Sequence, residues 1–257
     1  MKCLRLACTL ACALVTTTFL TPTMAADMTH ERALAVAKEP HNWLLHHGNY
    51  EGHRFSQLKT INTGNVENLK MVFSVALGGY ESGGRYKFGN LEGTPLVEDG
   101  VMYVTDGWGS VYAIDVTSGK RGQIRWKFDP GVDRAWAGDV ACCGINNRGV
   151  ALWKDKVISI ALDGRMFSLN KATGEMIWER KVADPAVAET ITLAPLVVRD
   201  IAIVGASGGG LIAGTSIALK AKAPDIRIIA AEPEGFDDTL RSFQSGKRER
   251  NPRMSGT

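Results

Sequence analysis

Two adjacent cysteines, Cys142 and Cys143, carry the most unusual chemistry of this chain. Neighbouring Cα atoms across a trans peptide are about 3.8 Å apart, whereas ordinary disulfides prefer roughly 5.5 Å, so a bridge between the two would close a distorted ring. Such a bridge closes almost no loop and therefore adds little stability through the unfolded chain. A flat, stiff ring could instead form a platform against a planar cofactor. The alternative is two buried free thiols in a turn, because cysteine is among the most buried residue types.

The residues after the cysteines favour the platform. The run from Cys142 to Trp153 has the pattern Cys-Cys-x-x-x-Asn-Arg-Gly-x-Ala-x-Trp. It resembles the corresponding run of the alcohol and methanol dehydrogenases that depend on pyrroloquinoline quinone (PQQ). The resemblance implies that Cys142 and Cys143 form a vicinal disulfide against the PQQ ring and that Arg148, five residues on, contacts the quinone.

Four more residues match positions around PQQ in that family. Glu92, in Leu-Glu-Gly-Thr-Pro, aligns with a glutamate beside the quinone, although a lone glutamate before a strand is otherwise an ordinary surface charge. Thr192 aligns with a threonine that contacts a PQQ carboxylate. Ser207 and Gly208 align with the start of a Ser-Gly-Ala-Glu loop. The resemblance therefore assigns all four residues to cofactor binding.

The residues that complete the family's active site have no match. The glutamate of the Ser-Gly-Ala-Glu loop ligates calcium, a suitable task for a hard oxygen donor, and here its place is taken by Gly210. The catalytic aspartate, the calcium asparagine and the ring-stacking tryptophan belong to later parts of those enzymes. His46, His47 and His53 lack an acidic or cysteine partner at ligand spacing, which favours a surface loop over a metal site. We therefore expect no catalytic and no metal-ligating residue.

Short alternating apolar runs separated by turn formers predict antiparallel strands. The turn formers include Asp99-Gly100, Asp106-Gly107 and Asp163-Gly164. The expected strands cover residues 72–75, 94–97, 101–104, 110–114, 151–153, 157–160, 165–169 and 176–178.

An internal repeat predicts how these strands are grouped. Ala113 to Gly119, leading to Trp126, corresponds to Ser168 to Gly174, leading to Trp178. In each copy a strand ends in an Asx-type turn closed by Ser-Gly or Thr-Gly, and a tryptophan then opens a strand that packs between neighbouring sheets. Repeats of four antiparallel strands are typical of a β-propeller. The repeat also resembles the tryptophan-docking motif of the eight-bladed quinoprotein propellers.

The chain before the first repeat has two parts. Residues 27–38 are compatible with a helix, whose extent Pro40 limits. Residues 42–69 resemble the first segment of PQQ dehydrogenases, in which tryptophan, tyrosine, arginine and serine side chains tie the start of the chain to the propeller. We expect the same of Trp43 and Tyr50.

Residues 1–26 predict a secretory signal peptide. Lys2 and Arg5 precede an apolar stretch that ends in small residues and is too short to span a membrane. Three of the five cysteines lie in this segment, so the exported chain keeps only Cys142 and Cys143, in an oxidising compartment where a bridge can form. We expect a periplasmic protein with no membrane span after cleavage.

Charge and composition narrow the choice of partners. Without Lys2 and Arg5, the 30 basic residues fall to 28 against 27 acidic ones. This near balance argues against a nucleic acid or an anionic membrane as partner.

The pattern changes after Ser207. Residues 211–221 predict a helix that follows a glycine loop, 226–231 a buried strand and 237–243 a short helix, which is α/β order. A glycine-rich loop that opens a helix can hold a phosphate. Residues 207–214, together with the later Glu-Pro-Glu-Gly run, resemble the threonine dehydratase and serine racemase family of pyridoxal phosphate (PLP) enzymes. Its Schiff-base lysine has no counterpart here.

The expected fold is mainly β, a partial β-propeller of two to three blades followed by a short α/β segment. We divide the chain into a signal peptide (1–26), a partial PQQ-dehydrogenase propeller (27–209) and a PLP-enzyme-like α/β fragment (210–257), joined near Ser207. The first hypothesis is a periplasmic PQQ-dependent alcohol dehydrogenase that oxidises primary alcohols with calcium-bound PQQ and passes electrons to a cytochrome c, present as an inactive N-terminal fragment. The second is a fragment of a PLP-dependent threonine or serine dehydratase or racemase. The third is a non-catalytic propeller-like binding piece.

Overall fold

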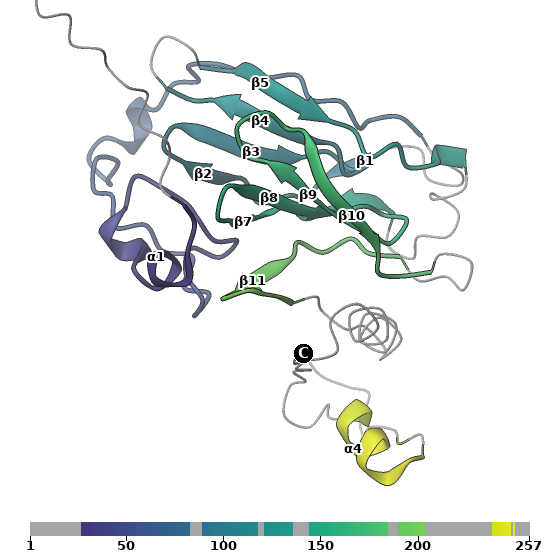
Figure 1. Cartoon of the computed structure of the whole chain (residues 1–257). Helices are drawn as coiled ribbons and strands as arrows, with labels where there is room; N and C mark the ends of the chain where they lie inside the picture. Colours follow the sequence, from purple (N-terminus) through teal and green to yellow (C-terminus); the bar gives the residue numbers. More distant parts are fainter. Residues whose placement is uncertain are drawn as a thin grey trace, which may run out of the picture.

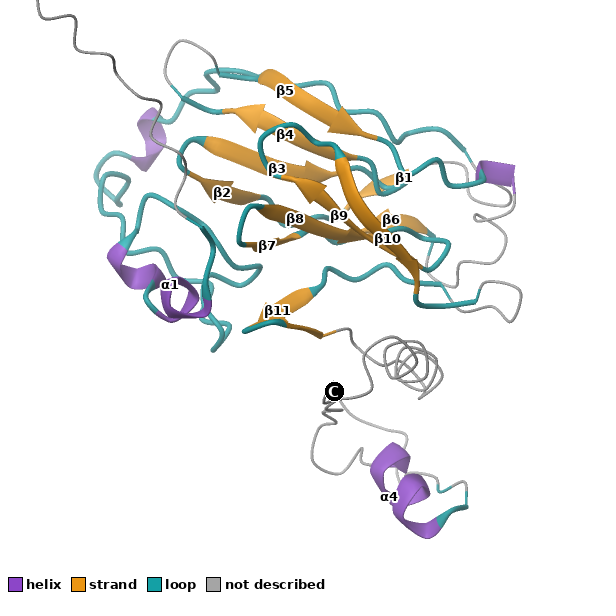
Figure 2. Ribbon diagram, in the orientation of Figure 1, coloured by secondary structure: helices purple, strands orange, loops and turns teal. Residues whose placement is uncertain are grey.

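The main body of the protein consists of two four-stranded antiparallel sheets (Figures 1 and 2). The structure is a computed structural model, and it describes residues 27–82, 89–117, 121–135, 144–184, 190–203, 238–247 and 249. In each sheet the strands follow one another in chain order, which is the arrangement of a propeller blade. The expectation of a mainly β, partial propeller is confirmed.

The first sheet contains the first copy of the repeat. Its strands, in spatial order, are β2 (Leu96–Glu98), β3 (Val101–Thr105), β4 (Val111–Asp115) and β5 (Gln123–Phe128). Every residue of β4 is buried, whereas β5 is exposed or half-buried throughout, as an outer edge strand is. Asp99 and Gly100 have φ of +49° and +79°, the left-handed values that a tight hairpin turn requires.

The second sheet repeats this order. It consists of β7 (Ala151–Trp153), β8 (Lys156–Ile160), β9 (Arg165–Asn170) and β10 (Met176–Lys181). Buried residues of both sheets form one continuous core, while β10 is again exposed or half-buried. The two copies of the sequence repeat therefore correspond to two blades.

Two smaller strand pairs accompany the blades. The hairpin of β11 (Leu196–Val198) and β12 (Ile201–Ile203) follows the second blade and begins a third sheet. A parallel pair, β1 (Gly89–Leu91) with β6 (Ile145–Asn147), joins the segments that precede the two blades. The sequence did not predict β1, β6, β11 or β12; each has only three residues, and β1 and β6 in particular consist largely of glycine and asparagine, which are not typical of strands.

Trp126 of β5 joins the first blade to the second. Its Nε1–H donates to the carbonyl oxygen of Lys171 at 3.1 Å, in the turn after β9. The indole ring lies on Gly174, where an added Cβ would be 2.6 Å from the ring atom Cδ2. Gly174 also has φ of +75°. The glycine that closes the repeat is therefore needed twice, once by the turn and once by the tryptophan of the preceding blade.

The first helix is shorter than expected. α1 (His30–Leu34) begins at Thr29, whose Oγ1 accepts a hydrogen bond from the Arg32 N–H at 3.2 Å. A separate 3₁₀ turn (Val36–Lys38) follows, because Ala35 leaves the helical conformation with φ of −104° and ψ of 16°. A second 3₁₀ turn covers Val66–Asn68.

The N-terminal segment is tied to the first blade and to the β11–β12 hairpin. Trp43 and Val97 of β2 exchange backbone hydrogen bonds of 2.8 and 2.9 Å. The Tyr50 hydroxyl donates to the Val197 carbonyl oxygen of β11 at 2.8 Å. These contacts confirm that Trp43 and Tyr50 hold the start of the chain against the sheets.

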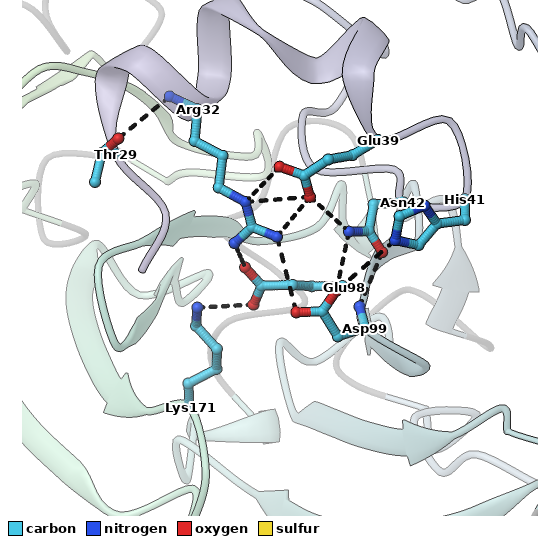
Figure 3. A network of polar contacts seen from close by, with 8 residues as sticks. All are labelled: Thr29, Arg32, Glu39, His41, Asn42, Glu98, Asp99 and Lys171. Carbon is cyan, nitrogen blue, oxygen red and sulfur yellow. Dashed lines mark hydrogen bonds and ion pairs between the residues drawn. The ribbon is translucent and has the colours of Figure 1, made fainter. Parts of the chain in front are cut away.

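A buried charge network lies where α1 meets the two blades (Figure 3). Glu98, 1% exposed, accepts a hydrogen bond from Arg32 Nη1 at 2.5 Å, and its Oε2 forms an ion pair with Lys171 Nζ at 2.7 Å. Arg32 also pairs with Glu39 at 2.7 Å, and its hydrogen bonds lower the pKa of the Glu39 carboxyl from 4.5 to about 2. Glu98 belongs to the first blade and Lys171 to the second, so the network links three parts of the chain.

The expected strand at residues 72–75 does not form. Phe73 and Val75 lie 3.1 and 3.2 Å from where a Cβ of Gly122 would be, so this segment packs on the turn before β5 without pairing with a described strand. The alternation of these residues therefore reflects side-chain packing.

Further along the chain, α4 (Asp238–Ser245) confirms the helix expected near residues 237–243. The helix expected at 211–221 and the strand at 226–231 lie outside the described residues. Within the described ranges, no helix combines the length and apolar character needed to cross a membrane.

Candidate functional site

Arg148 stands at the centre of the candidate site. Its Nη2 lies 3.1 Å from Oε2 of Glu92, and its Nη1 donates to Oγ1 of Thr192 at 2.5 Å. The structure therefore brings together three residues, far apart in sequence, that the resemblance assigns to PQQ binding. Their contact with PQQ stays a prediction.

Backbone hydrogen bonds fix Arg148 between the same two segments. The Arg148 N–H donates to the Thr192 carbonyl oxygen at 2.9 Å, and the Thr94 N–H donates to the Arg148 carbonyl oxygen at 3.2 Å. Arg148 is thus held on both sides by main chain as well as by its guanidinium. We call this group of Glu92, Arg148 and Thr192 the arginine centre.

Each member of the arginine centre precedes the first strand of a different sheet. Glu92 stands four residues before β2, and Thr192 four residues before β11; each begins a segment that continues Pro-Leu-Val at the strand. Arg148 stands three residues before β7. The segments that lead into three successive sheets therefore meet at one point, and the repeat of the fold builds the site.

Glycines allow these segments to approach one another. Gly149 has φ of +121°, and a Cβ there would be 3.1 Å from the Thr94 carbonyl oxygen. At Gly93 a Cβ would be 2.8 Å from Oγ1 of Thr105. Side chains at either position would push the segments apart, so the glycines beside Arg148 and Glu92 are structural requirements of the arginine centre.

Two asparagines of β6 belong to the site and were not predicted from the sequence. Asn146 Nδ2 lies 3.4 Å from Oε1 of Glu92. Asn147 is buried, and its Oδ1 accepts from the Gly149 N–H at 2.9 Å. Their signal was present as the Asn-Asn pair before Arg148, but an uncharged amide is too common in proteins to mark a functional position by itself.

The arginine centre is open to a ligand. The Arg148 and Glu92 side chains are 42% and 37% exposed, so neither is committed to the protein interior. A guanidinium presents a fork of N–H donors that matches carboxylate or quinone oxygens, while a carboxylate accepts from an N–H. The group can therefore bind a planar, oxygen-rich anion along its edge. It contains no general base placed beside a nucleophile.

The remaining predicted site residues cannot be placed. Cys142 and Cys143 lie outside the described residues, and so do Ser207 and Gly208. Residues 136–143, which include both cysteines, lie outside the described residues. In the sequence only the four residues 144–147 separate Cys143 from Arg148. The vicinal disulfide remains a prediction.

The histidines considered as metal ligands are hydrogen-bonded to neighbours in the N-terminal segment and to Thr94. His46 Nε2 lies 3.3 Å from Thr94 Oγ1, and His47 Nδ1 accepts from Arg54 Nε at 3.2 Å. His53 Nδ1 lies 2.8 Å from Asn49 Nδ2. Among the described residues, a cluster with ligand atoms close enough for a metal is formed by Glu39, His41 and Asp99, and Arg32 already lies within 4 Å of both of these carboxylates.

Fold and site together define a class of protein: part of a β-propeller whose blade-leading segments converge on an arginine. The family model described as "Glucose/ethanol/alcohol dehydrogenase, beta-propeller domain", a PQQ family, matches residues 43–211. This chain therefore belongs to the family of PQQ-dependent alcohol dehydrogenase propellers.

Individual relatives agree with this assignment. The chain is 39% identical over 181 residues to the lanthanide-dependent methanol dehydrogenase of Methylacidiphilum fumariolicum, covering 70% of this chain and 28% of the relative. It is 34% identical over 189 residues to methanol dehydrogenase [cytochrome c] subunit 1 of Methylorubrum extorquens, covering 71% and 28%. The solved structure of quinohemoprotein alcohol dehydrogenase ADHIIG from Pseudomonas putida HK5 is similar with a TM-score of 0.64 and 39% identity, covering 72% of this chain and 25% of that one.

Two further findings bear on the extent of the chain. The chain spans little more than a quarter of the length of these relatives. A second family model, "Pyridoxal-phosphate dependent enzyme", matches residues 173–256. Both resemblances inferred from the sequence are therefore confirmed, while the point where they join stays open because the two matches overlap over residues 173–211.

Proposed function

We propose that this chain forms the first blades of a periplasmic PQQ-dependent alcohol dehydrogenase and that its arginine centre binds PQQ. One observation carries the proposal: Glu92, Arg148 and Thr192, assigned to PQQ by resemblance alone, converge within hydrogen-bonding distance of one another.

The chemistry of the three side chains fits PQQ. PQQ is a planar tricarboxylate with two quinone oxygens and a ring N–H. Arg148 offers N–H donors to the oxygens, the Thr192 hydroxyl can donate to a carboxylate, and Glu92 can accept from the ring N–H. The half-exposed ion pair between Arg148 and Glu92 can open toward such a ligand at small cost, since exposed ion pairs contribute about 1 kcal/mol or less.

Bound PQQ supplies the two-electron oxidising power needed to convert a primary alcohol to an aldehyde. The residues of this chain contribute binding and orientation. Arg148 holds the quinone side by charge, and Cys142 with Cys143 form the platform under the ring. Among the described residues, the arginine centre has no general base placed beside a nucleophile, and Gly210 stands in place of the family's calcium-ligating glutamate. We therefore propose that PQQ binds without turnover.

The relatives and the first residues support proposals for the metal, the electron acceptor and the location. One relative is named as lanthanide-dependent and another as cytochrome c-linked. We propose that the complete enzyme uses calcium or a lanthanide ion with PQQ, oxidises a small primary alcohol and reduces a cytochrome c. Residues 1–26 have the composition of a secretory signal peptide, which supports export to the periplasm.

We further propose that the propeller part covers residues 27–209 and that a PLP-enzyme-like fragment covers 210–257. The overlap of the two family matches spans this boundary. The second candidate function, a fragment of a PLP-dependent threonine or serine dehydratase or racemase, rests on the match over residues 173–256. The third candidate, a propeller-like piece without cofactor, requires that neither cofactor bind.

Cofactor retention separates the three candidates. The purified full chain is dialysed against PQQ with Ca²⁺, PQQ with La³⁺, or PLP, and bound cofactor is measured by absorbance. We expect PQQ to be retained, no PLP imine band, and no alcohol-dependent reduction of an artificial electron acceptor. Retention of PLP alone would support the second candidate, and retention of neither the third. Measurable alcohol oxidation would contradict the proposal that the chain is inactive by itself.

A further inference from the structure

Asn147, next to Arg148, uses its side-chain donor, its side-chain acceptor and its carbonyl oxygen in hydrogen bonds. It is 2% exposed, at the end of β6 and directly before Arg148. Its Nδ2 donates to the Ile160 carbonyl oxygen at 2.7 Å, and its Oδ1 accepts from the Gly149 N–H at 2.9 Å. Its carbonyl oxygen accepts from the Thr105 Oγ1 at 3.4 Å. These contacts reach β3 of the first blade and β8 of the second.

The two side-chain hydrogen bonds of Asn147 fix the backbone on either side of Arg148. The bond to the Gly149 N–H closes an Asx-type turn with Arg148 at its middle. The bond to Ile160 anchors that turn to the second blade. Because Gly149 has φ of +121°, the turn depends on this capture of its N–H. Asn147 therefore fixes the Cα of Arg148, from which the guanidinium reaches outward.

An amide is the side chain that satisfies both partners. Asparagine donates from Nδ2 and accepts at Oδ1, and both functions are used. An aspartate would still accept from the Gly149 N–H but would place a negative oxygen against the Ile160 carbonyl. A leucine would lose both bonds and leave two buried polar groups unpaired. The structure thus favours asparagine here because only its amide both donates to the Ile160 carbonyl oxygen and accepts from the Gly149 N–H.

We propose that Asn147 is a positioning residue for PQQ binding that acts through Arg148. The inference rests on the proposed function and extends it to a residue that does not touch the cofactor. Arg148 carries the contact, and Asn147 sets its reach and direction. A misplaced turn would leave the guanidinium present but out of line with the ligand.

The test is a double-mutant cycle on PQQ affinity, measured by equilibrium dialysis of the full chain. Its four members are the parent chain, Asn147→Asp, Arg148→Ala and the double variant. We expect Asn147→Asp to weaken PQQ binding at least tenfold in the parent background and less than twofold in the Arg148→Ala background, because nothing is left to position. A residue that merely stabilises the fold would cause similar losses in both backgrounds.

Asn170 provides a matched control. Its Oδ1 accepts from the Ala172 N–H at 2.9 Å, so it closes the same kind of turn after β9, and its hydrogen bonds involve no residue of the arginine centre. Asn170→Asp should change PQQ affinity less than twofold. If Asn147→Asp fails to fold by circular dichroism, Asn147→Ser, whose hydroxyl can still accept from the Gly149 N–H, replaces it in the cycle.

The outcomes separate the inference from the function on which it rests. Binding of PQQ by the parent chain with additive losses in the cycle would overturn the role of Asn147 and leave the proposed function intact. Unchanged affinity of Asn147→Asp would do the same. No PQQ binding by the parent chain would overturn the proposed function and the inference together.

Discussion

At the scale of single residues, Arg148 makes several specific contacts, although its side chain contributes little to the free energy of folding. Its side chain is 42% exposed and pairs with a Glu92 side chain that is 37% exposed. Ion pairs of this exposure contribute about 1 kcal/mol or less to folding. The main-chain bonds of Arg148 to Thr192 and Thr94 do not depend on the guanidinium at all. The position of the guanidinium is therefore better explained by binding than by folding.

This difference predicts how an alanine substitution behaves. Arg148→Ala should reduce the free energy of unfolding by less than about 1 kcal/mol, measured by urea denaturation, because only an exposed pair and a hydroxyl contact are lost. A loss of several kcal/mol would show that Arg148 is a structural residue.

His46, which contacts Thr94 next to the arginine centre, makes the free energy of unfolding depend on pH. Burial lowers the pKa of His46 below its usual 6.5, and the charges of His47 and Arg54 lower it further. As the pH falls, His46 is therefore protonated at a higher pH in the unfolded chain than in the folded protein. The stability associated with neutral His46 is complete above about pH 6.5 and is lost progressively below it.

Urea denaturation at pH 7.5 and pH 5.5 tests this dependence. The parent chain should lose more stability on acidification than His46→Gln, which offers Thr94 an amide that does not titrate in this range. Equal losses for the two chains would exclude His46 as the titrating group.

At the scale of elements, the contact of Trp126 with Gly174 explains why the repeat has its sequence. The indole of one blade occupies the space where a side chain of the next blade's turn would be. Trp178 is the equivalent residue of the second blade and packs against the same continuous core. The tryptophan and the glycine of the repeat are thus complementary parts of one interface between blades.

Substitution of two glycines separates this contact from backbone strain. Gly174→Ala should reduce the free energy of unfolding by about 2–4 kcal/mol, from a positive φ and a Cβ 2.6 Å from the Trp126 ring. Gly131 has a similar φ of +64° with nothing within 4 Å, so Gly131→Ala should cost only about 1 kcal/mol. Thermal or urea unfolding that gives equal losses would contradict the packing role of Gly174.

The sequence predicted the parts of the fold that repeat or carry charge. The two copies ending at Gly119 and Gly174 sufficed to group the strands into blades, and the resemblance singled out Glu92, Arg148 and Thr192. What it could not supply was pairing between distant short segments, such as β1 with β6, or the buried amide of Asn147. The alternation at residues 72–75 was interpreted as a strand because side chains packing on Gly122 have the same period of two.

At the scale of the whole molecule, the N-terminal segment links the two blades through ion pairs. Glu98 of the first blade lies between Arg32 of α1 and Lys171 of the second blade (Figure 3). Lys171 is 9% exposed and Glu98 1%, so water cannot substitute for a missing partner. Removing one member leaves a buried charge undercompensated.

The network therefore predicts a large effect of a single charge. Lys171→Met should reduce the free energy of unfolding by about 3 kcal/mol. Lys154 pairs with Asp200 at a similar distance, 2.9 Å, but the two side chains are 51% and 77% exposed, so Lys154→Met should cost less than about 1 kcal/mol. Comparable losses in urea denaturation would show that burial does not distinguish the two pairs.

The segment between the first helix and the first blade carries several exposed apolar side chains. Large side chains between residues 55 and 72 are exposed, with Met71 at 85% and Phe55 at 73%. Apolar side chains exposed in this way are available to pack against further protein. The relatives are nearly four times as long as the part that matches this chain.

The most direct test of the central claim is a calorimetric titration of PQQ into the purified full chain and into Arg148→Ala. If the arginine centre is a PQQ site, the parent chain should bind PQQ at one saturable site, and Arg148→Ala should bind it at least tenfold more weakly. Absence of saturable binding, or the same affinity in both chains, would contradict the assignment of the arginine centre to the cofactor.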